Sequence, residues 1–392
     1  MDRRSILTGI AALALLTAPG ASWAQDAVKI GVILPLSGQF ADLATQMDNG
    51  IKLYMKQKGD TVAGKKIEII RKDSGGVAPD VATRLAQELI TRDNVDILAG
   101  LLLSPNAIAV SKVAAEAKKF TVIMNAATTV IITMSPYSVR TSMTLPSVAA
   151  TAGAWAHKSG LRKAYTMVSD FAPGKDAEAA FQEAFKAAGG EIIGSVRMPV
   201  ANPDFSAFVQ RAKDLNPESI FIFVPGGAQP AALGKAFAER GVDAAKIKII
   251  GTGEVVDESS VKNMGDAALG IMSVWHYDYN DASAMNKEFV AAYNAEFKRN
   301  PDFGSVGGYD GMQVIYEALK KAGGKTDGDS LIAAAKGIGF ESPRGPIQID
   351  PETRDIVQNL YIRQVRKVGD GLRNVVVDKV EKVKDPGSAG KK

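Results

Sequence analysis

The sequence has no cysteine and only two histidines, His157 and His276, among its 392 residues. The lack of cysteine excludes disulfides, thiolate metal sites, thiol nucleophiles and a lipid-anchored cysteine. Two histidines leave little for metal binding or acid–base catalysis, and neither lies in a pattern typical of a catalytic base. We therefore expect no enzyme activity, no cofactor and no bound metal.

The chain also lacks a strong excess of charge of one sign. Lys and Arg total 47 and Asp and Glu total 43, which gives a formal net charge of +4. So weak a basic excess argues against a nucleic-acid-binding protein. Hydrophobic residues make up 46% and charged residues 23%, as in ordinary globular proteins. A prior of roughly 150 residues per domain suggests two domains.

The N-terminal segment has the three parts of a secretory signal peptide. Arg3 and Arg4 precede an apolar run over residues 6–16, and Ser22 and Ala24 are the small residues of a cleavage site. The run is shorter than the roughly 20 residues that a membrane-spanning helix needs. The sequence therefore predicts a signal peptide over residues 1–24 and a periplasmic mature protein. Arginines in this position are compatible with either Sec or twin-arginine export.

Short runs rich in β-branched residues alternate with helical patterns along the rest of the chain. One such pattern places Ala177, Phe181 and Phe185 on a single helix face. This alternation predicts parallel sheets with helices on both faces. Because the pattern breaks near residues 141–148 and restarts, we expect two doubly wound α/β lobes. The expected strands are Val28–Leu34, Ile67–Arg71, Val95–Ala99, Thr121–Met124, Ala164–Val168, Ile192–Met198, Ile220–Val224, Ile247–Ile250, Leu360–Val368 and Arg373–Val383.

Two fragments imitate enzyme signatures but lack essential parts. Gly324-Lys325-Thr326 is similar to the end of a phosphate-binding loop, but Leu319 stands where the first glycine is required. Asp73-Ser74-Gly75-Gly76 is similar to the nucleophile loop of trypsin-like serine proteases, without a histidine base to activate it. A periplasmic hydrolase is therefore only a distant alternative.

Two polar loops after neighbouring strands are better candidates for a binding site. Ser104 and Pro105 together form a helix-start signal, and a helix N-terminus offers unpaired N–H groups to an anion. Ala126 and Thr128 follow the next strand, where small residues allow backbone N–H groups to approach a ligand. Because ligands bind beyond the carboxyl ends of strands in open α/β sheets, these loops should converge. Simple helix capping and an ordinary polar loop are the alternative interpretations.

Similar features follow the strands of the second half. Phe171 lies in the loop after one strand, Gly227 after the next, and Glu254 after a third. Tyr309 opens a helix that is expected to face the cleft, and Phe40 completes the set of candidate ligand contacts. Core packing for the aromatic residues and a solvated surface charge for Glu254 are the alternatives.

Several segments occur in an order that is characteristic of one family. They are Lys29-Ile30-Gly31-Val32, Pro35-Leu36-Ser37-Gly38, the Gly100 to Ser104 turn, Ala126-Ala127-Thr128, the Asp170 to Gly174 turn, Asp204-Phe205 and Gly265-Asp266-Ala267-Ala268-Leu269-Gly270. With them, nearly all of the mature chain resembles the periplasmic branched-chain amino-acid-binding proteins of ABC importers.

The resemblance implies the type I periplasmic binding protein fold, with two parallel-sheet lobes joined by three hinge crossovers. Lobe one would comprise residues 27–145 and 276–356, and lobe two residues 146–275 and 357–385. Residues 386–392, rich in Gly, Ser and Lys, are expected to form a disordered tail.

The resemblance also implies roles for single residues. The family's contacts to the ligand carboxylate fall on Ser104, Ala126 and Thr128, and its ammonium-binding glutamate falls on Glu254. Two departures matter: Pro173 replaces a tyrosine, and Ala228-Gln229 replace an aromatic residue. These changes resemble a branch of the family that takes up aromatic acids.

We therefore expect a periplasmic solute-binding protein that closes about its hinge over a small carboxylate with an apolar, aromatic body. A branched-chain or other hydrophobic amino acid is the alternative ligand. The expected partner is an ABC permease in the inner membrane, and the protein is expected to be a monomer. A ligand sensor that feeds a receptor is equally compatible with the sequence.

Overall fold

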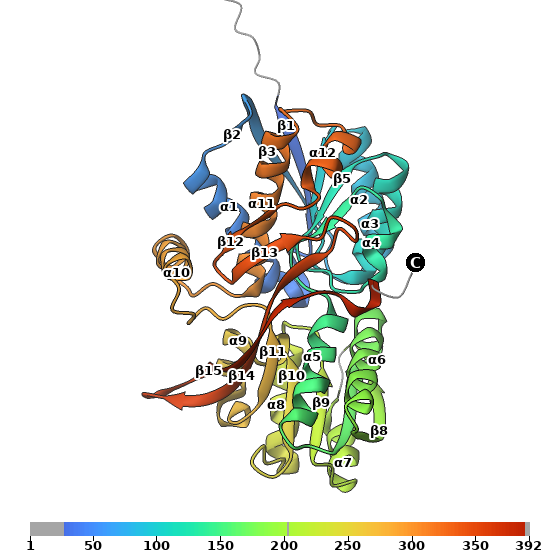
Figure 1. Ribbon diagram of the computed structural model, residues 1–392, viewed down its shortest axis with the longest axis vertical. Helices are drawn as coiled ribbons and strands as arrows, with labels where there is room; N and C mark the ends of the chain where they lie inside the picture. Colours follow the sequence, from blue (N-terminus) through green and yellow to red (C-terminus); the bar gives the residue numbers. More distant parts are fainter. Residues whose placement is uncertain (1–26, 202–203, 389–392) are drawn as a thin grey trace, which may run out of the picture.

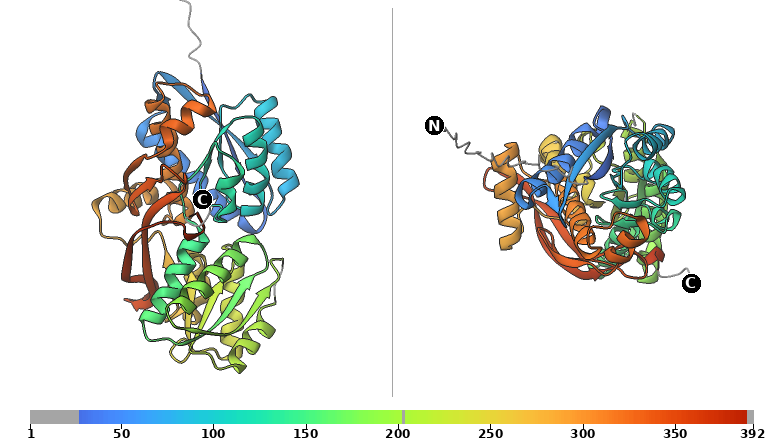
Figure 2. Two further views of the ribbon diagram at one scale, coloured as in Figure 1. Left: turned by 45° about the vertical axis from the view of Figure 1, so that its right-hand side comes forward. Right: turned by 90° about the horizontal axis from the view of Figure 1, so that it is seen from above.

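The computed structural model describes residues 27–201 and 204–388, which form two lobes, one above the other in Figure 1. Each lobe has a central β-sheet with helices on both faces (Figure 2). No helix in the described part of the chain is long and apolar enough to cross a membrane. The predicted signal peptide, residues 1–24, lies outside the described residues. The predicted tail begins with the 3-10 helix η4 (Pro386–Ser388), and residues 389–392 also lie outside the description.

The first lobe is built on a six-stranded sheet with the order β2-β3-β1-β4-β5-β6. Its strands are parallel except β2, which runs antiparallel to β3. Alternate residues of the central strand β1 serve opposite faces: Val32 joins one hydrophobic core and Ile33 joins another. The strands are β1 (Val28–Leu34), β2 (Thr61–Val62), β3 (Lys65–Asp73), β4 (Ile97–Gly100), β5 (Phe120–Ile123) and β6 (Ser138–Arg140).

Helices cover both faces of this sheet. α2 and α3 pack together on one face, whereas α1 and α11 pack together on the other. The short 3-10 helix η1 (Gly38–Phe40) leads from β1 into α1. The helices of this lobe are α1 (Ala41–Lys58), α2 (Pro79–Thr91), α3 (Ser104–Glu116), α4 (Val130–Met134), α10 (Ala284–Phe297), α11 (Phe303–Lys321) and α12 (Gly328–Ala335).

A nine-stranded sheet forms the centre of the second lobe and extends through its last strands beside the first lobe, and it is more mixed than the sequence predicted. Strands β8, β7, β9, β10 and β11 are parallel neighbours in that order. β14 then pairs antiparallel with β11, β13 and β15, because the chain returns to this sheet as hairpins rather than through helices. The strands are β7 (Lys163–Ser169), β8 (Glu191–Met198), β9 (Ser219–Phe223), β10 (Lys248–Thr252), β11 (Met272–Trp275), β12 (Gly339–Ser342), β13 (Gly345–Ile349), β14 (Ile356–Val368) and β15 (Gly371–Val383).

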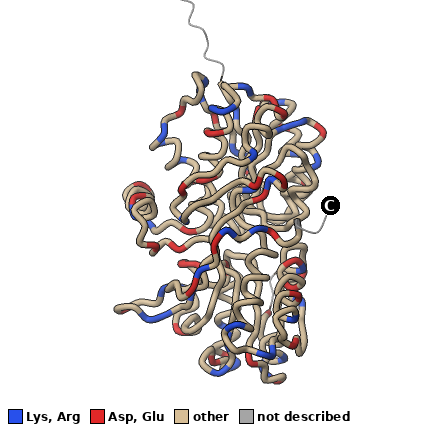
Figure 3. The backbone as a smooth tube through the Cα atoms, viewed as in Figure 1, with Lys and Arg blue, Asp and Glu red and all other residues tan. Residues whose placement is uncertain are grey.

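The helices of the second lobe again form two layers. α5 packs on α6 over one face, while α8 contacts both α7 and α9 over the other. Lys, Arg, Asp and Glu are interspersed over both lobes (Figure 3). The helical elements are α5 (Leu145–Lys158), α6 (Ala172–Ala187), α7 (Ser206–Asp214), α8 (Gln229–Arg240), η2 (Gly253–Val256), α9 (Glu258–Met264) and η3 (Gly265–Ala268).

Three segments carry the chain between the lobes: residues 141–144, 276–283 and 350–355. β12 and β13 precede the third segment and lie beside α11 of the first lobe (Figure 1), yet their pairing with β14 joins them to the sheet of the second lobe. The first segment is anchored to the β13–β14 region, because Arg344 and Gln358 both donate to the carbonyl of Ser142, at 2.9 and 2.6 Å. The hinge is therefore bonded together by buried polar side chains.

Candidate ligand-binding site

A small cavity lies between the lobes, where the carboxyl ends of the parallel strands of both sheets meet. Small-molecule sites are mostly apolar, with a few precisely placed polar groups. The cavity has that character. Its lining residues are Phe40, Leu43, Leu102, Leu103, Ser104, Asn125, Ala127, Leu145, Phe171, Pro173, Phe223, Pro225, Gly226, Glu254 and Phe303.

Ser104 provides a hydrogen-bond donor at the first-lobe side of the cavity. It is the first residue of α3 and only 3% exposed. Its Oγ accepts the backbone N–H groups of Ala127 and Thr128, at 3.1 and 3.3 Å. Because a hydroxyl accepts twice and donates once, its proton can be donated to a ligand. The N-terminus of α3 adds partial positive charge, so this side of the cavity suits a carboxylate.

The loop that follows β5 stands behind Ser104. Ala127 and Asn125 line the cavity, whereas Ala126 and Thr128 are buried behind them and are not part of the lining. The carbonyl oxygens of Ala126 and Thr128 accept hydrogen bonds from Arg140, at 2.7 and 3.0 Å. The loop therefore lies next to Ser104, as predicted. The residue that lines the cavity, however, is Ala127, which stands between the two predicted contacts, Ala126 and Thr128.

Aromatic side chains form the walls of the cavity. Phe171 and Phe223 of the second lobe stack with ring centroids 5.9 Å apart and planes 21° apart. Phe40 lies on the first-lobe side, and Phe303 stands edge-on to Trp275 at 5.1 Å. Stacked and edge-on rings are the arrangements that aromatic groups prefer, so these walls offer ring faces and edges to an aromatic ligand.

Glu254 lies in η2, directly after β10, and lines the cavity from the second lobe. It is 6% exposed, and its Oε2 atom has no hydrogen-bond partner among the described residues. Burial raises the pKa of Glu254 to about 7, because a desolvated carboxylate is disfavoured. Of the described residues that line the cavity, Glu254 alone has an ionisable side chain. Near neutral pH it can therefore both donate and accept a hydrogen bond.

Two predicted contacts lie elsewhere. Tyr309 is buried in the core of the first lobe, where its hydroxyl donates to Gln57 at 2.6 Å and its ring packs edge-on against Tyr54 at 5.0 Å. Gly227 adjoins the cavity lining at Gly226 and has a φ of +87°. A Cβ atom at Gly227 would lie 2.6 Å from the carbonyl oxygen of Gln39 in the other lobe. Gly227 therefore permits a close contact between the lobes, and Tyr309 is a packing residue.

The profile of the periplasmic binding protein family matches residues 27–371. The chain belongs to the periplasmic binding protein family. Among curated relatives of this binding protein, the Leu/Ile/Val-binding protein homolog 6 of Brucella melitensis is 39% identical over 382 residues, which cover 96% of this chain and 98% of the relative. The predicted family is therefore confirmed.

Solved structures of similar proteins confirm the two-lobed α/β fold of this binding protein. A solute-binding protein of an ABC transporter from Rhodopseudomonas palustris BisB5, in complex with 3,4-dihydroxybenzoic acid, is 53% identical with a TM-score of 0.89. That similarity covers 93% of this chain and 99% of the other. One from R. palustris HaA2, in complex with p-hydroxybenzoic acid, is 40% identical with a TM-score of 0.90, over 93% and 100% of the two chains. The family and these neighbours are solute-binding transport proteins.

Several residues that line the cavity of this binding protein were not among the contacts predicted from the sequence. Phe223 ends β9, a strand whose residues are all buried, so its position resembles that of a core residue. Phe303 begins α11, far from the other contacts in sequence. The feature that could have identified them is their position, since Phe223 ends a strand and Phe303 begins a helix. Their aromatic character alone did not separate them from the core.

Proposed function

We propose that this protein is the periplasmic receptor of an ABC importer and binds a small aromatic carboxylate that carries a ring hydroxyl. The observation that carries the proposal is that polar groups lie at two opposite sides of the cavity, with aromatic walls between them. Ser104 and the α3 N-terminus lie on the first-lobe side, aromatic walls lie between, and Glu254 lies on the second-lobe side. The aromatic acids bound by the two R. palustris proteins support this assignment.

The proposed binding mode assigns a role to each side of the cavity. The ligand carboxylate accepts from the Ser104 hydroxyl and benefits from the helix dipole. Its ring packs between Phe171, Phe223 and Phe40, and its hydroxyl bonds to Glu254. A ligand held by both lobes stabilises the closed arrangement, because differential affinity for one state shifts the hinge equilibrium.

A branched-chain amino acid is the second candidate, favoured by the names of the Brucella relatives. Its ammonium group would require an ionised partner, because a buried unpaired charge costs several kcal/mol. Glu254 is the residue that could provide it, but its burial favours the neutral carboxyl. The aromatic walls also exceed what a leucine side chain needs. Both considerations support the aromatic acid.

The supporting functions follow from this assignment. Residues 1–24 act as a cleaved export signal, and the closed monomer delivers its ligand to an inner-membrane permease. The chain then acts as a transport protein and performs no chemistry on its ligand. Incubation with candidate esters and amides should therefore show no turnover.

The test is calorimetry and thermal denaturation of the mature protein with 4-hydroxybenzoate, 3,4-dihydroxybenzoate, benzoate and leucine. A ligand that binds only the folded state raises the melting temperature. We expect the hydroxybenzoates to bind more tightly than benzoate, and leucine to have no effect. Binding of leucine without binding of any benzoate would replace the proposal by the amino-acid alternative.

A further inference from the structure

Arg140, the last residue of β6, is fully buried and lies directly behind the ligand cavity. Its Nη1 atom donates to the carbonyl of Ala126 at 2.7 Å and its Nη2 atom to that of Thr128 at 3.0 Å. Its Nε and Nη2 atoms donate to the two carboxylate oxygens of Asp355, at 2.9 and 3.3 Å. One guanidinium group thus bridges two carbonyls and a carboxylate.

These contacts hold the loop of residues 125–129 from the side opposite Ser104. The N–H groups of Ala127 and Thr128 point to the Ser104 oxygen, while the carbonyls of Ala126 and Thr128 point to Arg140. The peptide groups on both sides of Ala127 are therefore fixed in orientation. Because the guanidinium fork is planar and rigid, a lysine ammonium cannot reproduce this arrangement.

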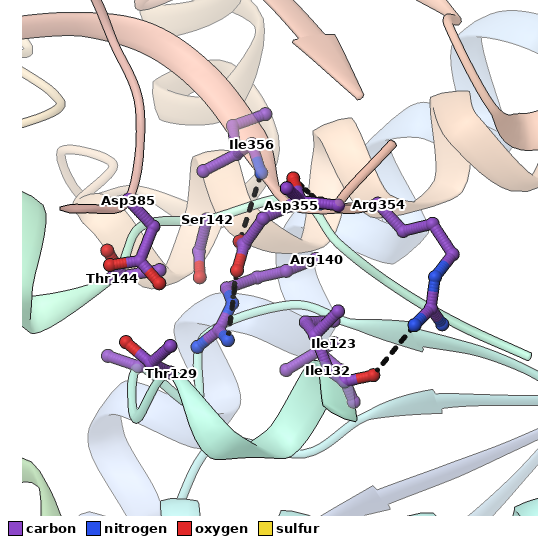
Figure 4. Close-up of polar contacts among 12 residues, drawn as sticks. Ile123, Thr129, Ile132, Arg140, Ser142, Thr144, Arg354, Asp355, Ile356 and Asp385 are labelled. Carbon is purple, nitrogen blue, oxygen red and sulfur yellow. Dashed lines mark hydrogen bonds and ion pairs between the residues drawn. The ribbon is translucent and has the colours of Figure 1, made fainter. Parts of the chain in front are cut away.

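The other end of the contact lies in the hinge. Asp355 closes the third crossover, immediately before β14, and its Oδ1 also accepts the N–H of Ile356 at 3.0 Å. Figure 4 shows Arg140 between this carboxylate and Thr129 of the loop. Asp355 stands 215 residues after Arg140 in the sequence. The pair therefore joins the ligand loop to a segment that must change conformation when the lobes move.

We propose that Arg140 is a positioning residue that orients the ligand loop for carboxylate binding and ties it to the hinge at Asp355. This inference rests on the proposed function, since it assumes that the ligand carboxylate lies at Ser104. Arg140 itself does not line the cavity. It acts through the backbone of residues 126–128.

A matched control is available in Arg354, the neighbour of Asp355. Its guanidinium also donates to backbone carbonyls, those of Ser135, Ser138 and Ile132, at 2.6, 3.1 and 3.0 Å. Ile132 lies in α4, Ser135 directly follows it and Ser138 begins β6, so these hydrogen bonds of the Arg354 side chain do not involve residues 125–129. Arg354→Lys therefore perturbs the same region without releasing the ligand loop.

The experiment compares Arg140→Lys, Asp355→Asn and Arg354→Lys with the wild type. Hydrogen exchange of the ligand-free proteins reports the amides of Ala127 and Thr128. We expect these amides to exchange faster in Arg140→Lys, to a smaller extent in Asp355→Asn, and at the wild-type rate in Arg354→Lys. If Arg140→Lys does not fold, Asp355→Asn carries the test.

Affinities for 4-hydroxybenzoate and 4-hydroxybenzamide provide the second readout. Loss of a well-oriented charged hydrogen bond corresponds to about tenfold or more in affinity, so Arg140→Lys should lose about that factor for the acid and less for the amide. A purely structural role would weaken both ligands equally and overturn the proposal, as would unchanged exchange of the loop amides. If the wild type binds no benzoate, the proposed function fails, while the exchange result still decides whether Arg140 positions the loop.

Discussion

Replacing Glu254 by glutamine tests the electrostatics of the cavity, since it removes a titratable group and keeps its size. Burial raises the pKa of Glu254 from 4.5 to about 7. This difference corresponds to about 3 kcal/mol, because one pKa unit is about 1.4 kcal/mol. The unfolded chain releases the proton near the lower value and the folded chain near the higher one. The stability due to this group is therefore fully present below about pH 4.5 and lost as the pH rises through about 7.

Glutamine is neutral in both states, so this pH dependence should disappear in Glu254→Gln. Between about pH 5 and pH 8, the free energy of unfolding of the ligand-free variant should fall less than that of the wild type, by up to about 3 kcal/mol. Denaturant titrations at several pH values measure the free energy of unfolding of both proteins. An equal change of the free energy of unfolding with pH in the two proteins would refute a buried, neutral Glu254.

The same variant separates the two ligand classes. If the ligand is a hydroxylated aromatic acid, Glu254→Gln should cost about 1 kcal/mol of binding, the value of one neutral hydrogen bond. An amino-acid ligand would lose roughly 2–4 kcal/mol, because its ammonium would be left without a charged partner. A large loss combined with leucine binding would refute the aromatic assignment.

Glu258→Gln is the matched control for this experiment. Burial also raises the pKa of Glu258 to about 7, but its side chain lines a neighbouring cavity with Arg363 rather than the ligand cavity. This variant should reduce the pH dependence of stability in the same direction and leave the affinity for 4-hydroxybenzoate unchanged. A loss of affinity in Glu258→Gln would show that the neighbouring cavity influences binding.

Three further predictions follow from the site and the N-terminus. Ser104→Ala should weaken 4-hydroxybenzoate binding by about tenfold or more, because a charged hydrogen bond is lost. The control is Ser111→Ala, which changes a buried serine in the same helix but outside the cavity and should bind with wild-type affinity. Calorimetry measures both affinities, and equal values would mean that the carboxylate binds elsewhere. Gly227→Ala should hold the lobes apart, because its Cβ atom would clash with the carbonyl oxygen of Gln39. Small-angle scattering should therefore show a smaller ligand-induced decrease in the radius of gyration than for the control Gly371→Ala, where a Cβ atom meets open space. An equal decrease in both variants would contradict this role of Gly227. Protein recovered from the periplasm should have an intact mass that begins at Gln25, and a full-length chain in the cytoplasm would disprove the predicted export signal.

Local pattern alone predicted much of the fold. Val28–Leu34 was expected as a strand and is β1, because a run of apolar residues buried on both faces is typical of a central parallel strand. Ser104 and Pro105 were expected to start a helix, and α3 begins at Ser104. Predictions of this kind succeed because backbone periodicity and helix-end chemistry depend on residues close in sequence.

Part of the site was also accessible in this way. Ser104, Phe171, Glu254 and Phe40 were expected at the ligand and do line the cavity. The first three follow strands, and the carboxyl ends of parallel strands must meet at one edge of a sheet. Tyr309 was predicted to contact the ligand but packs in the core. It lies on a helix, and periodicity does not say whether a given helix face meets the cleft or the core.

The sequence by itself therefore determined most of the parallel strands, the two-lobed architecture and the family. Only the tertiary structure decided which side chains reach the cavity and what holds them there. Arg140 and Asp355 are a buried pair separated by 215 residues, and Phe223 and Phe303 come from different lobes. No local pattern encodes such pairs, because their contact depends on how complete sheets and helices pack against each other.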